Sequence, residues 1–409
     1  MNKVNTKKKI LVVMPKFPYP PTGACEQDRS SGLELFIKLG YEIRVIAKVT
    51  DREAKEVLGV SEKLGIQIFP VPYTFMKEES VLAKIARLFV RIINPLFWDG
   101  ASYEYRDREI KKVFMRELDE FKPDLVWVEY TTLWPLYKYA RNINIPIITR
   151  SINFEPTHFI EEDGLSFFNV FKFLSKFLGE IITIKKSDVM LAITPKEEKI
   201  YKKYKAKKTM TLPLRGLSRF LGYEVEIRDS KKLNVFFMGS TYNVSHNRKA
   251  LEMVVSKIAP LAEKTYPDSF TFHIMGAKLP LGFDKFFNDK IVYHGYVPKS
   301  DEFLSDMDIA IIPSLFGQGM QQKIFEPLAR GIPTITSERG LAGYPFENEK
   351  HLLLADSTED FVNMLGSIRD PKERERLSRN AKELSKEIFS AEKMEAVVGK
   401  STRLALGKK

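Results

Sequence analysis

The sequence predicts an α/β protein made of two doubly wound, Rossmann-like domains. Short runs that are apolar throughout recur along the chain, as in parallel strands that helices cover on both faces. Longer amphipathic stretches lie between these runs and complete repeated strand–helix units. A length of 409 residues, of which 44% are hydrophobic and 29% charged, suits two globular domains.

The first half of the chain supplies five strand candidates and two clear helices. The expected strands are residues 10–14, 43–47, 124–130, 146–151 and 188–194, and the expected helices are 30–40 and 106–121. The first apolar run ends at Met14, shorter than the core of a signal peptide, and no small-residue cleavage site follows it. We therefore expect a first strand in a cytoplasmic protein. A single cysteine, Cys25, fits a reducing compartment.

The second half repeats the pattern after a polar interruption. Its expected strands are residues 234–239, 270–276, 308–314, 333–337 and 351–355, with a long helix at 245–265. Between Pro213 and Lys232 the apolar periodicity lapses. We expect an N-terminal domain at 1–213, a linker at 214–232 and a C-terminal domain at 233–390. A final helix and basic tail at 391–409 should pack back toward the first domain.

The charge balance points to an anionic partner. Lysine and arginine exceed aspartate and glutamate by 65 to 53, a net charge of +12, which suits phosphorylated ligands or acidic lipid. A surface that is simply rich in lysine would give the same excess. The basic residues are dispersed, without zinc-ligand spacing or a nucleic-acid motif, so nucleic acid is not expected.

The most informative segment follows the strand that ends near Ser314. Ligands of doubly wound sheets bind beyond the carboxyl ends of the strands, where helices begin. We expect a helix from Gln321 or Gln322 to Arg330, with Pro327 in its first turn and Gly331 as a left-handed cap.

Such a helix would offer an anion site at its start. The amides from Gly319 to Gln322 would be free to bind an anion, and Lys323 beside them suits a diphosphate. Glu326 shares the face of Lys323 and suits sugar or ribose hydroxyls. A capped surface helix with an ordinary Lys–Glu pair is the alternative.

Motifs in both halves resemble the large group of retaining glycosyltransferases with the GT-B fold, family 4 or "group 1". The resemblance is carried by the segments 17–23, 123–130, 149–155, 234–251, 291–314 and 323–344. It implies two Rossmann-like domains facing an interdomain cleft. It also implies a nucleotide-diphosphate sugar, with UDP or GDP, transferred with retention of configuration and without a required metal or other cofactor.

The resemblance assigns a donor site to the second domain. Glu326 matches the glutamate that ends the E-x7-E motif and holds the ribose, and Lys323 should neutralise the leaving diphosphate. The first glutamate of that motif is Gln318 here, which can bind a sugar hydroxyl but carries no negative charge. The remaining expected donor contacts are Gly23, Ser240, Asn247, Arg248, Tyr296, Gly319, Met320, Gln321 and Gln322.

Two of these positions depart from the family pattern. Ser240 and Asn247 stand where the family usually has arginine and lysine for the diphosphate, with Arg248 next along the chain. Ile152 stands where a histidine is common, and His158 could substitute for it if its loop turns inward. With Lys323 and Gln318, His158 completes the expected catalytic set.

The acceptor should be bound by the first domain, through Arg29, Glu129, Tyr130, Asn153 and Glu155. Glu129 could instead cap a helix, and Asn153 could close a turn. The expected activity is that of a hexosyl-type glycosyltransferase acting on a glycan or lipid-linked acceptor, in polysaccharide or glycoconjugate synthesis at the cell surface. A nucleotide-sugar-binding scaffold without turnover is the alternative, and a sugar epimerase or phosphorylase on the same fold is a third.

Residues 81–98 have the composition of a helix that lies on anionic lipid, with Lys84, Arg87 and Arg91 opposite an apolar face. Residues 166–179 add five phenylalanines and two lysines. Either segment could face the protein core instead, and for 166–179 the core is favoured. The first segment predicts a peripheral position on the inner face of the membrane.

Overall fold

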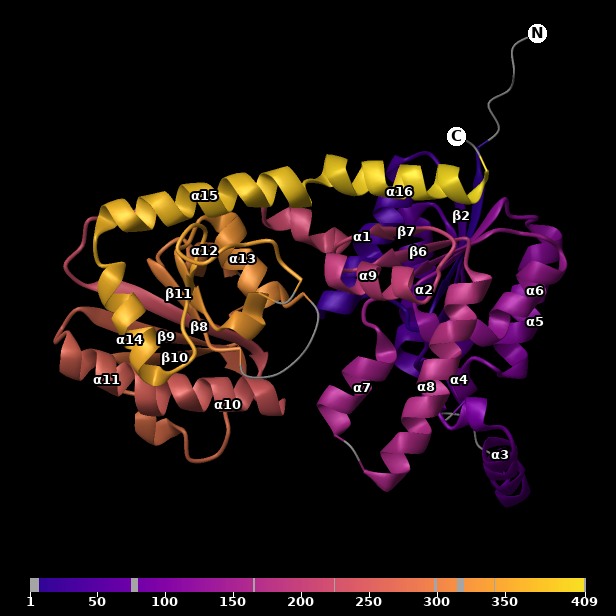
Figure 1. Cartoon of the computed structure of the whole chain (residues 1–409), viewed down its shortest axis with the longest axis horizontal. Helices are drawn as coiled ribbons and strands as arrows, with labels where there is room; N and C mark the ends of the chain where they lie inside the picture. The colour runs from indigo at the N-terminus through magenta and orange to yellow at the C-terminus, as the bar shows by residue number, and fades with distance from the viewer. Residues whose placement is uncertain are drawn as a thin grey trace, which may run out of the picture. The chain divides into compact units, whose positions relative to one another are not determined.

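The structure is a computed structural model of the chain. It describes residues 7–74, 80–164, 166–223, 225–297, 300–314, 320–341 and 343–407. Two compact units make up the chain (Figure 1). Unit 1 comprises Met1–Gly216 together with Ala391–Lys409, and unit 2 comprises Leu217–Ser390.

Unit 1 is built on a seven-stranded parallel sheet of order β3-β2-β1-β4-β5-β6-β7. The strands are β1 (Lys9–Met14), β2 (Glu42–Val49), β3 (Gln67–Pro72), β4 (Leu125–Val128), β5 (Ile147–Arg150), β6 (Val189–Ala192) and β7 (Thr209–Thr211). The order reverses between β1 and β4, so the carboxyl ends of these two strands are where a doubly wound sheet offers a ligand crevice.

The helices of unit 1 connect successive strands, and a last one returns from the end of the chain. They are α1 (Ala24–Lys38), α2 (Asp51–Leu64), α3 (Val81–Ile93), η2 (Pro95–Phe97), α4 (Gly100–Glu104), α5 (Arg108–Glu120), η3 (Thr131–Leu136), α6 (Tyr137–Asn142), α7 (Glu155–Asp163), α8 (Phe167–Lys186), α9 (Pro195–Lys203) and α16 (Ala391–Ala405). Helix α16 lies against β5, β6 and β7 (Figure 1). The Lys208 ammonium donates to the carbonyl of Leu404 at 3.0 Å, which holds its end.

Unit 2 has a six-stranded parallel sheet of order β10-β9-β8-β11-β12-β13. The strands are β8 (Leu233–Thr241), β9 (Phe270–Ala277), β10 (Ile291–Gly295), β11 (Ile309–Ile312), β12 (Thr334–Thr336) and β13 (Leu353–Leu354). The helices are η4 (Arg215–Phe220), which crosses the boundary between the units, α10 (Ser245–Met253), η5 (Val254–Ile258), α11 (Ala259–Thr265), η6 (Asp284–Phe286), α12 (Ser300–Leu304), α13 (Gln322–Arg330), η7 (Glu338–Leu341), α14 (Thr358–Ser367) and α15 (Pro371–Phe389).

The predicted fold class, two doubly wound parallel sheets, is confirmed. Every side chain from Ile10 to Met14 in β1 is at most 1% exposed, as expected for a strand covered on both faces. The strands that the sequence reading did not pick out are β3, β7 and β10, and each lies at the edge of its sheet. Edge strands tolerate polar residues and proline, which is why β3 contains Pro70 and Pro72.

Candidate functional site

The start of helix α13 is held at the carboxyl end of the second sheet by hydroxyl contacts. Ser314, just after β11, donates its amide to the Ser337 hydroxyl, which in turn donates to the carbonyl of Ser314, both at 2.8 Å. The Ser314 hydroxyl donates to the side-chain carbonyl of Gln321 at 3.1 Å. Gln321 is the N-cap of α13, and its own carbonyl accepts the Tyr344 hydroxyl at 3.2 Å. These bonds fix where the amino end of the helix lies.

The predicted bounds of this helix are confirmed. It begins at Gln322 and ends at Arg330, and Gly331 closes it with a φ of 79°. Pro327, however, is the sixth residue of the helix and lies in its second turn rather than its first. Two residues of the predicted site, Gln318 and Gly319, lie outside the described residues.

Lys323 is the cation of this helix end, and it is joined to the first strand of the unit. Its ammonium donates to the side-chain carbonyl of Asn247 at 3.2 Å. Asn247 is 5% exposed, and its amide nitrogen donates to the carbonyl of Thr241 at the end of β8, at 3.0 Å. Burial lowers the pKa of Lys323 to about 8. Lys323 and Asn247, two of the residues predicted for the donor site, therefore lie together at the carboxyl ends of neighbouring strands.

Glu326 lies one turn further along α13 and is 7% exposed. Arg330 donates to its carboxylate at 3.0 Å. Burial raises the pKa of Glu326, while Arg330 and Arg219 act to lower it. The Arg330 guanidinium in turn lies over the ring of Tyr223, at 3.9 Å from the ring centre. The carboxylate is thus oriented by a cation that is itself fixed by an aromatic ring.

The other predicted donor residues fall into two kinds. Ser240 at the end of β8 and Arg248 on α10 are exposed, and Tyr296, just after β10, is 72% exposed. Met320 is 7% exposed, so it is packed in the protein next to the start of α13. Gln322, the first residue of that helix, is half-buried.

In unit 1, four charged side chains form a buried network at the carboxyl ends of the central strands. They are Asp28 on α1, Glu129 just after β4, Arg150 at the end of β5, and Arg215 where the chain leaves the unit. The Arg215 guanidinium donates to Glu129 at 2.8 and 2.9 Å and to Asp28 at 2.9 Å. Arg150 donates to Asp28 at 3.0 Å. None of the four is more than 3% exposed.

This network changes the interpretation of Glu129, which the sequence reading placed on the acceptor side. Glu129 is 1% exposed, and the indole of Trp127 also donates to it, at 2.8 Å. Both oxygens of its carboxylate accept hydrogen bonds from buried side chains of unit 1, so the carboxylate is not available to an acceptor. Burial would raise the pKa of Asp28, but Arg150 and Arg215 hold it below its ordinary value. Arg215, which sequence reasoning missed, lies in the segment expected to be a linker.

The remaining predicted acceptor residues line the same edge of the sheet. The Tyr130 hydroxyl donates to Glu155, which also accepts the Lys176 ammonium at 3.0 Å. Burial raises the pKa of Tyr130, and the Glu155 carboxylate raises it further. Asn153 precedes α7 and His158 lies on it, and both are half-buried.

Arg29 lies on α1 next to Asp28. It is 5% exposed, and its Nε, like the Nε and Nη1 of Arg150, has no hydrogen-bond partner among the described residues. A buried guanidinium without a bonded anion is costly, so this side chain is suited to an incoming anionic or hydroxyl-rich group.

Gly23 is the N-cap of α1, with extended backbone at φ −108°. A Cβ at this position would lie 2.4 Å from the carboxylate of Glu26. That carboxylate pairs with Lys16 at 2.7 Å. A phosphate that approached Gly23 would therefore have to displace Glu26 from the end of the helix.

Two further carboxylates of unit 1 lie buried near Glu155. Burial raises the pKa of Glu180 to about 8, and that of Glu197 to about 7. Tyr201 donates to Glu180 at 2.8 Å, and the amide of Phe154 donates to Glu197 at 3.2 Å. They support the loop that carries the predicted acceptor residues.

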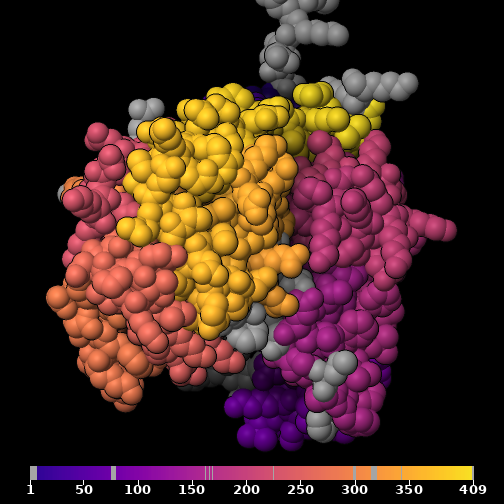
Figure 2. Space-filling view, turned by 60° about the vertical axis from the view of Figure 1, so that its left-hand side comes forward, coloured from indigo at the N-terminus to yellow at the C-terminus, as the bar shows by residue number. Residues whose placement is uncertain are grey.

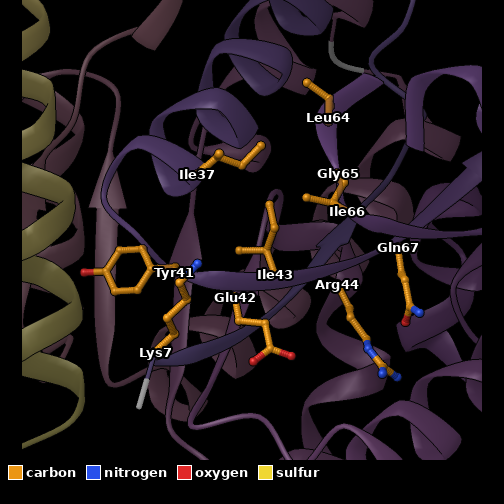
Figure 3. Close-up of a pocket in the computed structure, with 10 residues that line it drawn as sticks. All are labelled: Lys7, Ile37, Tyr41, Glu42, Ile43, Arg44, Leu64, Gly65, Ile66 and Gln67. Carbon is orange, nitrogen blue, oxygen red and sulfur yellow. The ribbon is translucent and has the colours of Figure 1, made fainter. Parts of the chain in front are cut away.

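A hollow of about 300 Å³ lies at the opposite edge of the first sheet (Figure 3). It is lined by the ends of α1 and α2 and by the first residues of β2 and β3, including Glu42 and Gln67. Ligands of doubly wound sheets bind at the carboxyl ends, so this hollow is not part of the candidate site. Within the described residues, no group of three or more histidine, cysteine, aspartate or glutamate side chains is placed to hold a metal ion.

Comparison with known proteins supports this architecture. Residues 232–369 match the family model described as "Glycosyl transferases group 1". No curated protein sequence matches the chain. Among solved structures, sucrose-phosphate synthase from Thermosynechococcus elongatus superposes with a TM-score of 0.71 at 14% identity, over 98% of this chain and 100% of that one. The chain has the GT-B fold.

Two other GT-B structures match over nearly their whole length. TarM, from S. aureus, matches with a TM-score of 0.67 at 11% identity, over 98% of this chain and 99% of its own. Anabaena HepE, solved with UDP and glucose, matches with a TM-score of 0.61 at 12% identity, over 97% and 99%. At such identities the likeness establishes the fold, and the residues that match the family model all lie in unit 2.

Proposed function

We propose that this GT-B protein transfers a hexosyl residue from a nucleotide-diphosphate sugar to a glycan or lipid-linked acceptor, with retention of configuration. The observation that carries the proposal is the Lys323–Asn247 contact, which brings a half-buried cation to the amino end of α13 at the carboxyl edge of the second sheet. HepE has been solved with UDP-glucose, and a TarM variant with UDP and fondaparinux, which is consistent with a UDP-sugar donor.

Departure of the nucleotide diphosphate requires charge stabilisation more than a strong base. In the proposed reaction the bond between the anomeric carbon and the diphosphate breaks, and the electron pair goes to the diphosphate. The acceptor hydroxyl oxygen bonds to the same carbon and passes its proton to the departing diphosphate. Lys323 and the first amides of α13 would hold the leaving diphosphate, because both lie where the positive end of the helix dipole points.

Glu326 would accept hydrogen bonds from the ribose hydroxyls. Its contact with Arg330 fixes the carboxylate on the face of α13 that Lys323 shares. Ser240, Arg248, Met320, Gln321 and Gln322 would complete the donor site in unit 2, and Tyr296 would contact the base.

The acceptor would be recognised by unit 1. Arg29, Tyr130, Asn153, Glu155 and His158 are the proposed contacts, and the buried Arg29 favours an acceptor with a phosphate or several hydroxyls. We assign Glu129 to the stability of the unit instead. We further propose a role in cell-surface polysaccharide or glycoconjugate synthesis and a peripheral position on the inner membrane face.

Calorimetric titration with UDP, GDP and their common sugar conjugates, without added metal, tests the donor site. We expect saturable binding of one nucleotide, weakened by Glu326→Gln. Lys323→Ala should reduce turnover more than affinity. Lys257→Ala, an exposed lysine on η5, serves as the matched control and should change neither. Equal turnover in the Lys323 and Lys257 variants would refute the role of Lys323 in leaving-group departure.

A nucleotide-sugar-binding scaffold is the second candidate, favoured by Gln318 in place of the first glutamate of the E-x7-E motif. Such a protein would bind the donor and show neither transfer nor donor hydrolysis. Gln318→Glu would then be expected to create measurable donor hydrolysis. Turnover by the natural sequence would exclude this candidate.

A further inference from the structure

Helix α3 exposes its apolar face to solvent, which is unusual for a helix of a globular protein. Its apolar side chains point away from the body of unit 1. Seven of them are between 47% and 79% exposed: Val81, Leu82, Ile85, Leu88, Phe89, Ile92 and Ile93. Its least exposed residues are Arg87, Val90 and Arg91, on the opposite side. The space-filling view shows the helix projecting at the lower edge of unit 1, in dark indigo (Figure 2).

The first half of α8 carries a second exposed apolar stripe. Phe167, Val170, Phe171 and Leu174 are between 37% and 74% exposed. Their spacing of three and four residues places them on one face of the helix. The sequence reading favoured the core for this segment, and the structure corrects it, because this face of α8 is open to solvent.

The two stripes are held together by the turn between α3 and α4. The Ser175 hydroxyl of α8 donates to the carbonyl of Leu96 at 2.9 Å and accepts the amide of Asp99 at 3.0 Å. Trp98 packs on Phe171, with ring centres 4.7 Å apart. Arg91 fastens α3 to the same turn, since its guanidinium donates to the carbonyls of Phe97 and Trp98 at 3.1 and 3.0 Å. Both stripes thus belong to one surface, which we call the α3–α8 surface.

The charge of this surface indicates what covers it. Residues 80–98 and 166–179 contain no aspartate or glutamate. Of their five basic residues, Arg91 and Lys176 are bonded inward, to the Phe97 and Trp98 carbonyls and to Glu155, whereas Lys84 and Lys172 are exposed. A second copy of the chain would place like charges against like in a symmetric contact, with no acid in these segments to pair them. An apolar face bordered by cations is complementary to an anionic bilayer.

We propose that the α3–α8 surface lies on an anionic lipid membrane, with the apolar stripes at the level of the acyl chains and the lysines among the headgroups. No helix of the described residues is long and apolar enough to cross a membrane, which is consistent with a helix that lies in the interface. What this membrane position means for the acceptor depends on the proposed function. Both α3 and the start of α8 lie beyond the carboxyl ends of the first sheet, the edge where Glu155 and His158 lie, so a lipid-linked acceptor would reach these residues from the membrane (Figure 1).

Vesicle flotation of the full chain tests this, with phosphatidylcholine alone and with phosphatidylcholine mixed with phosphatidylglycerol. We expect binding to the mixed vesicles that weakens with salt. Phe89→Asp on α3 and Val170→Asp on α8 should each weaken it by about tenfold or more, because each removes one large apolar side chain from the interface. Leu58→Asp is the control, since Leu58 is 69% exposed on α2, outside the surface, and should leave binding unchanged.

Several results would overturn the proposal. They are absence of vesicle binding, equal binding to neutral vesicles, an equal loss in the Leu58 variant, or a dimer in sedimentation velocity that dissociates on Phe89→Asp. An unchanged Val170 variant would confine the surface to α3 and overturn its composite nature. Nucleotide titration of the natural sequence separates this proposal from the donor site: nucleotide binding without vesicle binding refutes the membrane surface alone, and vesicle binding without nucleotide binding refutes the donor site alone.

Discussion

Replacement of Glu129 by glutamine should destabilise unit 1 without touching the surface of the protein. Glutamine keeps the shape of the side chain but removes its charge. In the buried network Asp28 and Glu129 balance Arg150 and Arg215, so the substitution leaves one uncompensated positive charge. The amide would also present N–H groups to the guanidinium of Arg215, where two short hydrogen bonds now exist.

The size of the effect follows from burial. Removing one partner of a buried ion pair costs about 3–5 kcal/mol, and the burial of all four groups places this network in that range. For a unit of this length each kcal/mol lowers the unfolding temperature by about 2–4 °C, so we expect a fall of roughly 6–20 °C in the transition of unit 1.

Thermal unfolding followed by circular dichroism measures this fall. Glu109→Gln is the matched control, because Glu109 is an exposed carboxylate on α5 of the same unit, and it should lie within about 0.5 kcal/mol of the parent protein. An unchanged unfolding temperature for Glu129→Gln, together with lost transfer to an acceptor, would refute the reasoning. It would return Glu129 to the acceptor side, where the sequence reading had placed it.

Three further predictions concern single groups. Burial lowers the pKa of Lys323 to about 8, and a bound diphosphate should raise it again, so binding of a nucleotide diphosphate above that pH should be accompanied by uptake of a proton. Calorimetry in two buffers of different ionisation enthalpy would detect this uptake. Lys323→Met should abolish the uptake. A Cβ on Gly32 would lie 2.2 Å from the Arg215 guanidinium, so Gly32→Ala should cost about 1–3 kcal/mol in urea unfolding, whereas Gly59→Ala on α2, with no atom within 4 Å, should not destabilise. The pKa of Glu180 is raised from 4.5 to about 8, so between these two values the folded state keeps a proton that the unfolded state has lost. The free energy of unfolding should therefore fall as the pH rises from 4.5 to about 8. Glu180→Gln should reduce the difference between the urea midpoints measured at the two ends of this pH range.

The sequence was sufficient for the interior of both sheets and for the best-defined helix of the site. Strands buried on both faces must be apolar throughout, so β1, β4, β6 and β11 are evident from composition alone. The end of α13 was equally readable, because a glycine after an arginine-ended helix matches the left-handed cap. Its chemistry was partly predictable, since Lys323 and Glu326 are three positions apart and share one face of the helix.

The network of unit 1 was not readable, because its members are far apart in the chain. Glu129 and Arg215 are separated by 86 positions, and nothing local distinguishes a glutamate that follows a strand and binds a ligand from one that binds a distant arginine. The polar stretch at 214–232 resembled a linker for the same reason. Arg215 contributes to the polar character of this stretch, yet its side chain is buried and only 3% of the residue is exposed.

The return of α16 to unit 1 has a consequence for how the protein is made. Residues 217–390 form an uninterrupted unit, whereas unit 1 needs segments from both sides of it. On the ribosome, β5, β6 and β7 emerge long before the helix that covers them. Unit 2 can therefore finish folding as soon as it has been synthesised, while the earlier part of the chain keeps an unfinished flank. Vectorial synthesis thus reverses the order of completion: the half of the protein that is translated first is the last to close.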